Sequence, residues 1–169
     1  MPQLAARSGV YIIMVEDGTM RFGQKIMLLA AFLLGSPAAW AALGQPVASV
    51  ENDRVNMQGE LKVIPGAGFN VHQITTPAGV AVKEYVTPSG VVFGVSWRGP
   101  VFPDLSLLLG KYITQFQRGA SSQPSYRRRH IMVHTADFVA ETGGHMRDLR
   151  GVAYLPGLLP PGVNQTAVK

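Results

Sequence analysis

The chain has 169 residues, of which 47% are hydrophobic and 15% are charged, and it contains no cysteine. Fifteen Lys and Arg against ten Asp and Glu give a formal net charge of +5. The length suits one domain rather than a multidomain assembly, and the apolar content is too high for a largely disordered chain. The lack of cysteine excludes disulfide scaffolds, cysteine-ligated zinc, iron–sulfur clusters and thiol catalysis.

Residues 20–41 have the pattern of a secretory signal peptide. Basic residues open the segment, residues 26–34 are an uncharged apolar run, and Ala39-Trp40-Ala41 is a small-x-small cleavage site. The run is too short for a membrane span, which needs about 20 residues. We therefore expect an exported protein, periplasmic or extracellular, cleaved after Ala41. An uncleaved anchor and a buried core helix are the alternatives.

Residues 1–19 fit poorly in front of such a signal, because a signal peptide normally begins with its basic start. We interpret Met20 as the true initiator and residues 1–19 as an over-called start. A genuine leader extension is the alternative.

Residues 42–155 are expected to form a single domain, and residues 156–169 a Pro- and Gly-rich C-terminal tail. Frequent Gly and Pro favour short elements joined by turns. The pattern predicts a helix over residues 46–57, a loop at the glycines of residues 59–68, and a strand over residues 69–75.

A β-hairpin is predicted over residues 80–98, because Thr87-Pro88-Ser89-Gly90 has the preferences of a type I turn. A two-residue loop places Glu84 opposite Phe93 on an apolar face; a longer, bulged loop would shift the pairing by one. The predicted apolar face consists of Val80, Val82, Glu84, Val86, Val91, Phe93, Val95 and Trp97.

A helix is predicted after Pro103, with Asp104 at its start as a cap or a first-turn acid. Two strands, residues 131–141 and 146–155, follow, joined by Thr142-Gly143-Gly144-His145. This hairpin would set Asp137 opposite Arg150. The element order predicts an α+β fold: an antiparallel sheet of about five strands with helices packed on one face. The helix stripe is formed by Leu105, Leu108, Leu109, Tyr112, Ile113 and Phe116.

Several short motifs occur along the chain: Lys83-Glu84-Tyr85-Val86, Trp97-x-Gly99-Pro100, Pro103-Asp104-Leu105, Gly143-Gly144-His145-Met146 and Ala153-Tyr154-Leu155-Pro156. Together they resemble one family, the uncharacterised secreted proteobacterial proteins known as domain of unknown function 2844. The resemblance implies export and a Gram-negative, β-proteobacterial host. Since the family has no assigned activity, the resemblance implies no catalytic residue.

Glu84 is the first candidate for chemistry, because the predicted register points its carboxyl into the apolar face. Burial raises the pKa of a carboxyl, as a general acid or base requires. Glu84 with a histidine such as His72 would make a small hydrolase or isomerase. An ion pair with a basic side chain, or a register error that leaves Glu84 in solvent, would give it no catalytic role.

Metal and cofactor sites are not expected. His130 and His134 have the i, i+4 spacing of a helical metal site, but the segment has the pattern of a strand, where their rings would lie about 13 Å apart. The chain has no Gly-x-Ser-x-Gly and no phosphate-binding glycine loop.

Arg127, Arg128 and Arg129 form the densest cluster of charge and are candidates for binding an anionic envelope component. A solvated loop that aids solubility is the alternative, and nucleic acid is not an expected partner. Taken together, the sequence favours a non-enzymatic exported module for binding or assembly, whose partner is such a component or another exported protein. No transmembrane helix is expected in residues 42–169.

Overall fold

The computed structural model describes residues 43–124 and 130–169. These residues fall within one compact unit, Ala38–Lys169. The predicted leader, the signal segment with its cleavage site after Ala41, and Arg127–Arg129 lie outside the described residues.

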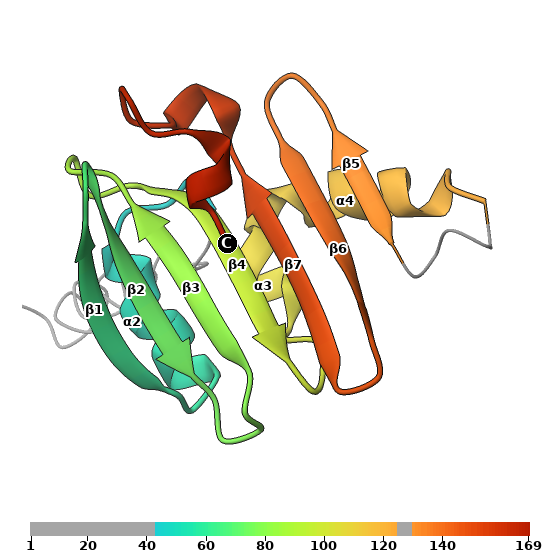
Figure 1. Ribbon diagram of the computed structural model, residues 1–169, viewed down its shortest axis with the longest axis horizontal. Helices are drawn as coiled ribbons and strands as arrows, with labels where there is room; N and C mark the ends of the chain where they lie inside the picture. Colours follow the sequence, from blue (N-terminus) through green and yellow to red (C-terminus); the bar gives the residue numbers. More distant parts are fainter. Residues whose placement is uncertain (1–42, 125–129) are drawn as a thin grey trace, which may run out of the picture. The chain divides into compact units, whose positions relative to one another are not determined.

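Seven strands form one antiparallel sheet in the order β1-β2-β3-β4-β7-β6-β5 (Figure 1). The predicted α+β class with about five strands is therefore wrong: the described part of the chain is mostly β, and its helical segments are short. The strands are β1 (Glu60–Gly66), β2 (Phe69–Thr75), β3 (Ala81–Val86), β4 (Val92–Gly99), β5 (Ile131–His134), β6 (Val139–His145) and β7 (Asp148–Tyr154).

The strand number was underestimated at two places. The predicted loop over residues 59–68 contains β1, which pairs with β2 through a tight turn at Gly68, where φ is +83°. The predicted strand over residues 131–141 is two strands, because the Thr135 hydroxyl accepts a bond from the Phe138 N–H and turns the chain between β5 and β6. Glycine and proline in a strand, as in β1, mark an edge strand as readily as a loop.

The last hairpin also differs from its prediction. Gly143 and Gly144 lie inside β6, and the turn comes later, at Met146-Arg147, with Arg147 in the left-handed region at φ +68°. Consequently Arg150 pairs with Gly143 and not with Asp137. Asp137 lies in the β5–β6 turn, where its carboxylate accepts bonds from Gln115 and Thr135.

Two irregularities set the register of the β3–β4 hairpin. Its loop has three residues and ends at Gly90, whose φ of +80° suits glycine. A bulge then inserts Phe93 between the pairs Val86–Val92 and Tyr85–Gly94. Phe93 therefore faces the side opposite to the one predicted, Val92 takes its place in the core, and Glu84 lies opposite Val95.

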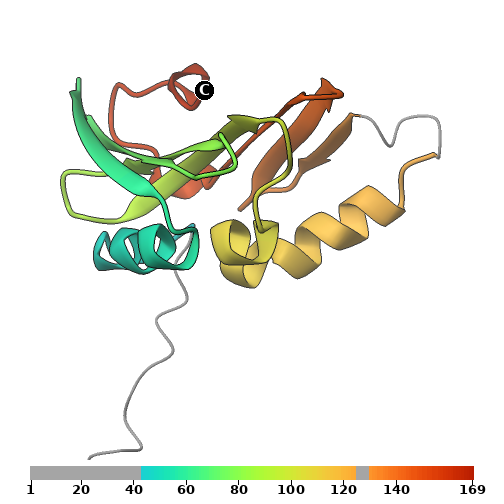
Figure 2. The same ribbon diagram turned by 90° about the horizontal axis from the view of Figure 1, so that it is seen from below.

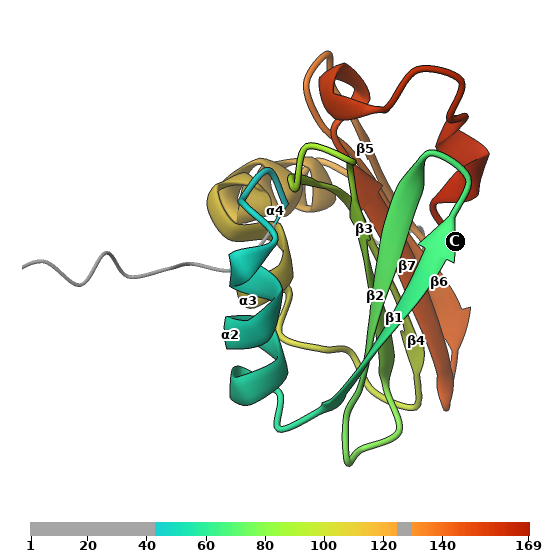
Figure 3. The same ribbon diagram turned by 90° about the vertical axis from the view of Figure 1, so that its left-hand side faces the viewer.

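Helical segments lie against one side of the sheet, which we call the inner face, while the C-terminal segment, residues 156–169, lies on the outer face (Figures 2 and 3). Asp104 caps its helix as predicted, with its carboxylate accepting from the Ser106 N–H at 2.8 Å. The single helix predicted after it is broken at Gly110, where φ is +50°. The helices are α2 (Ala48–Asn56), α3 (Leu105–Leu109) and α4 (Ile113–Ser121), with short 3₁₀ turns at Gly110–Tyr112, Pro156–Leu158 and Gln165–Ala167.

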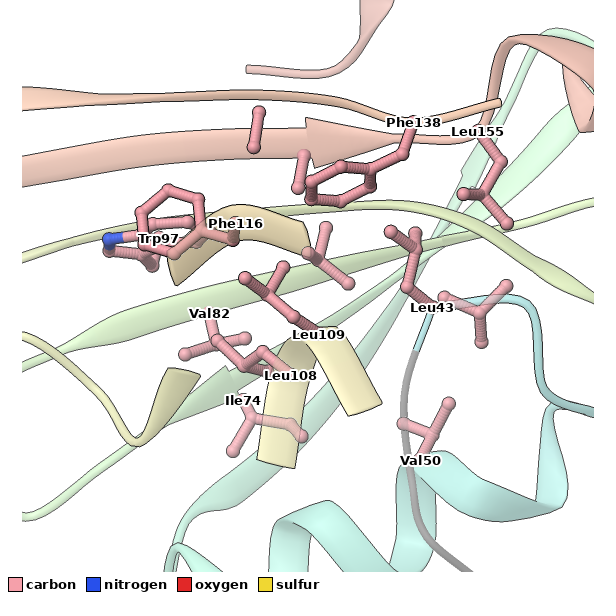
Figure 4. Close-up of a cluster of buried hydrophobic side chains, with 14 of the residues drawn as sticks. Leu43, Val50, Ile74, Val82, Trp97, Leu108, Leu109, Phe116, Phe138 and Leu155 are labelled. Carbon is pink, nitrogen blue, oxygen red and sulfur yellow. The ribbon is translucent and has the colours of Figure 1, made fainter. Parts of the chain in front are cut away.

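The main hydrophobic core fills the space between the inner face and the helices (Figure 4). A second cluster lies on the outer face, where Tyr85, Phe93 and Tyr154 are covered by Val168 of the C-terminal segment. The central strands are thus buried on both sides over part of their length. Leu43, Val50, Ile74, Val82, Trp97, Leu108, Leu109, Phe116, Phe138 and Leu155 are labelled members of the main core.

The close packing of Trp97 on Gly151 gives a test of this arrangement. A Cβ on Gly151 would lie 2.2 Å from Trp97 Cζ2 and 2.9 Å from the Glu141 carbonyl oxygen. Gly151→Ala is therefore expected to lower the free energy of unfolding by about 2 kcal/mol, a typical cost of overpacking. Gly157→Ala is the matched control, because a Cβ there meets nothing within 4 Å. Urea unfolding followed by circular dichroism measures both, and equal stabilities of the two variants would contradict the packing described here.

Candidate functional site

The outer face carries an open groove beside the C-terminal segment. It encloses about 650 Å³ and crosses β3, β4, β7 and β6. Small residues make up much of its lining. Its lining consists of Ala81, Lys83, Ser96, Trp97, Arg98, His130, Glu141, Thr142, Gly143, Gly144, Arg150, Gly151, Val152 and Lys169.

The antiparallel register arranges the groove residues in two rows across the strands. In one row Lys83 pairs with Ser96, Ser96 with Val152, and Val152 with Glu141. In the other row Ala81 pairs with Arg98, Arg98 with Arg150, and Arg150 with Gly143. Directly paired residues have their Cβ atoms about 5 Å apart on the same face. The sheet itself therefore holds the charged groups of the groove in place.

Positive charge dominates the lining. Lys83, Arg98, Arg150 and Lys169 contribute cationic side chains, whereas Glu141 contributes the one carboxylate in the lining of the described groove. The Glu141 carboxylate is partly engaged, because it lies 3.1 Å from His134 Nε2.

Arg98 and Arg150 stand directly opposite each other on β4 and β7. Like charges in this position destabilise a sheet. Asp148 offsets part of this repulsion: its carboxylate lies 2.7 Å from Arg98 Nε, and that hydrogen bond is the main cause that lowers the pKa of the Asp148 carboxyl. Arg150 is exposed and makes no ion pair with a described residue. Its guanidinium is available to an anion, with Gly143 leaving the neighbouring surface open.

The C-terminal segment forms one wall of the groove. The Lys169 N–H donates to the Tyr85 hydroxyl at 2.8 Å, and that hydroxyl donates to the Lys169 carbonyl oxygen. Lys83 Nζ donates to the same oxygen at 3.3 Å. Val168 fits over Gly94, where a Cβ would lie only 3.0 Å from its Cγ2. Contacts from β3 and β4 thereby fix the position of the wall.

A different polar group lies on the inner face, beneath α2. Glu84 of β3 and Asp53 of α2 are both 0% exposed. When both are counted as carboxylates, none of their four oxygens has a donor among the described residues. Protonation of one carboxyl would supply the missing donor, so that the two side chains can share a hydrogen bond inside the core.

Burial is the main cause of the shifted pKa values in this pair. It raises the pKa of Asp53 to about 6, although the hydrogen bond from Glu84 acts in the opposite direction. Burial also raises the pKa of Glu84 well above its ordinary value, and the nearby charge of Asp53 and the hydrogen bond to it raise it further. Two buried acids at close range cannot both ionise cheaply.

His72 lies directly opposite Glu84 on β2, so the structure brings the two predicted candidates to the same face. Burial lowers the pKa of His72, and its Nδ1 has no hydrogen-bond partner among the described residues. The partner of Glu84 is nevertheless Asp53 and not a histidine. The predicted ion pair of Glu84 with a basic side chain is absent from the described residues.

The other histidines take surface positions. His130 lines the groove, and His134 faces Glu141. Within residues 43–124 and 130–169, no three His, Asp or Glu side chains are grouped so as to hold a metal ion. None of the described helices is long and apolar enough to cross a membrane. The predicted anion-binding residues Arg127, Arg128 and Arg129 fall outside the described ranges, so that prediction stays untested.

Asp53 is a functional candidate that was not predicted from the sequence. The helix over residues 46–57 was predicted, but its buried side was not, and in α2 this side carries Ser49, Val50 and Asp53. The spacing of Asp53, three residues after Val50 and four after Ser49, indicates a shared face. The groove was missed for another reason. Its two rows combine residues from four strands, and the β6–β7 register depends on a turn that was misplaced.

Comparison with known proteins adds one finding. Residues 39–168 match the model of a family described as "Protein of unknown function (DUF2844)". No curated protein and no solved structure matches the chain.

The wall of the groove can be tested by removing a single oxygen atom. Tyr85→Phe deletes both hydrogen bonds to Lys169. We expect faster amide hydrogen exchange at Val168 and Lys169, by roughly fivefold, since one net hydrogen bond contributes about 1 kcal/mol. Tyr112→Phe serves as the control, because its ring stacks on Phe138 and its hydroxyl makes no hydrogen bond with a described residue. Unchanged exchange in Tyr85→Phe would show that the hydroxyl does not anchor the segment.

Proposed function

Since the chain belongs to this family, whose description assigns no activity, we propose a function for it. The protein is an exported, non-enzymatic binding module. It holds an anionic component of the cell envelope in the outer-face groove. The observation that carries the proposal is the cationic row of the groove, in which Arg98 and Arg150 are juxtaposed and Asp148 forms its ion pair with Arg98.

The chemistry of the groove suits a carboxylate or phosphate group on an extended ligand. Guanidinium groups bind such anions through two parallel hydrogen bonds. Arg150 offers this arrangement without first breaking an ion pair among the described residues. Lys83 lies in the neighbouring row and adds a second cationic contact.

The predicted export of the protein favours a ligand from the envelope. The segment over residues 20–41 has the basic start, apolar run and cleavage pattern of a secretory signal. An exported protein meets anionic lipid headgroups and acidic polysaccharides, and a cationic groove attracts both. Arg127, Arg128 and Arg129 precede the groove residue His130 in sequence and would add to the same attraction.

A small hydrolase or isomerase using Glu84 with His72 is the second candidate function. Its support is the cross-strand pairing of the two residues. The burial of Glu84 weighs against it, because a side chain with 0% exposure has no direct contact with a substrate in this conformation. We therefore favour the binding module.

The binding proposal predicts an effect of Arg150→Gln. Polygalacturonate serves as the carboxylate probe, and vesicles containing phosphatidylglycerol serve as the phosphate probe. We expect the variant to bind the preferred probe about tenfold more weakly, which corresponds to about 1.4 kcal/mol. Raising the salt concentration should weaken binding further, because exposed charges are screened.

Arg118→Gln is the matched control, because it removes the same charge from an exposed arginine on α4 that does not line the groove. Equal binding by both variants, or binding to neither probe by the unaltered protein, would contradict the proposal. A parallel variant with Arg127, Arg128 and Arg129 changed to Ser tests the contribution of the basic cluster.

Export makes a separate prediction. Mass spectrometry of the protein purified from a Gram-negative periplasm should find Ala42 as the first residue. In a strain with blocked export, the longest form should begin at Met20. A peptide containing Tyr11 would show that residues 1–19 are translated and would overturn the interpretation of the start.

A further inference from the structure

The attachment of α2 to the sheet is unusual in its chemistry. The buried side of this nine-residue helix consists of Ser49, Val50 and Asp53, so two of its three buried residues are polar. An amphipathic helix normally docks through an apolar stripe. Here the contact of Asp53 with Glu84 takes the place that a second large apolar residue would fill.

Within the described ranges, no other charge compensates this contact. On α2 itself, Glu51 and Arg54 pair with each other at the surface, 2.7 Å apart. β2 presents His72, whose pKa is lowered by burial, so its ring is neutral above its ordinary titration range. β4 presents the apolar Val95 opposite Glu84.

Lys83, the cation next to Glu84 on β3, does not compensate the Asp53–Glu84 pair either. Lys83 belongs to the outer-face groove, where its ammonium group donates to the Lys169 carbonyl oxygen. No ion pair among the described residues includes either carboxyl of the pair. A single shared proton is therefore what allows the two carboxyls to lie together.

We propose that Asp53 and Glu84 form a proton-operated lock, in which one shared proton holds α2 against the sheet and its loss at alkaline pH releases the helix. When both carboxyls are ionised, two negative charges face each other in the core. A shift of α2 away from β3 separates them and lets water reach both. Release of the helix is thus the response that relieves the repulsion.

The direction of the pH effect follows from the pKa values. Both carboxyls have pKa values that are raised in the folded protein relative to their ordinary values. The folded state therefore binds protons more tightly than the unfolded state does. The stability that these protons supply is full below about pH 4 and is lost as the pH rises through the folded values, the first of which is about 6 for Asp53. His72 acts in the opposite direction, since its lowered pKa reduces stability as the pH falls below its ordinary value.

The ends of α2 are placed to allow such a release. Before the helix, the Val47 N–H donates to the Gly90 carbonyl oxygen at 2.8 Å, and Pro46 forms a bridge with Val91. After it, Gly59 packs against β2, where a Cβ would lie 2.4 Å from Ile74 Cγ2. The two anchors leave the helix between them as the part that can move.

The lack of cysteine in the chain supplies the test. Ser49→Cys places a single thiol on the buried side of α2, at a residue that is 5% exposed and whose hydroxyl has no partner among the described residues. Ser89→Cys places a reference thiol in the exposed β3–β4 turn. The rate of maleimide labelling of the Ser49→Cys variant, divided by the rate for the Ser89→Cys variant, reports the release of α2. Because a rising pH ionises both thiols and accelerates both reactions, the ratio corrects for that effect.

We expect this ratio to rise at least tenfold as the pH is raised from 5.5 through the alkaline range, where the proton that Glu84 keeps after Asp53 has ionised is lost. Glu84→Gln should abolish the rise, because the amide donates to Asp53 without a titrating proton. Glu51→Gln should preserve it, because it removes an exposed carboxyl from the same helix. The proposal would be overturned if the labelling ratio rose equally with and without Glu84→Gln, or if it did not change with pH in the protein that keeps Glu84.

A measurement on the unaltered protein guards against failure of Glu84→Gln to fold. The carboxyl carbons of Asp53 and Glu84 should titrate as a linked pair in ¹³C NMR, with at least one midpoint above pH 5.5. Two independent midpoints near pH 4 would overturn the lock, because both groups would then be ionised while α2 remains docked.

Discussion

Strand β4 is buried on both faces for most of its length, and the layout of the molecule follows from that constraint. Val92, Val95 and Trp97 point into the main core, while Phe93 points to the outer face. A strand of this kind needs a cover on each side, because exposed apolar surface costs about 25 cal/mol per Å². The helices supply one cover, and the C-terminal segment supplies the other. The outer face of β4 beyond Val168 is left open, and it forms part of the groove.

The same constraint explains the position of each charged group. Alternate side chains of a strand face opposite sides, so Lys83 and Tyr85 of β3 lie on the outer face while Glu84, between them, lies on the inner face. Three consecutive residues therefore serve three purposes: a cation for the groove, a carboxyl beneath α2, and a hydroxyl that anchors the C-terminal segment. The carboxyl is the costly member of the three, and its cost is reduced by a proton shared with Asp53.

Sequence patterns predicted the parts of the fold that depend on local chemistry. The Asp104 cap and the β3–β4 turn follow from the preferences of individual residues. The inward direction of Glu84 was also predicted, although its pairing with Phe93 was wrong. The extra residue at Phe93 depends on packing against Tyr85 and Phe69, which come from other parts of the chain. No local pattern contains that information.

Neither the number of strands nor the groove could be predicted from the sequence, for a related reason. Gly143 and Gly144 are typical turn residues, yet they continue β6, since Gly143 and its neighbours pair with β7. That register moves the turn to Met146-Arg147, and the pairing of β4 with β7 sets Arg150 beside Arg98 in the cationic row. A glycine in a strand can indicate a close approach or an open surface as well as a turn. Only the long-range pairing of β4 with β7 decides between these meanings, and the same pairing creates the site.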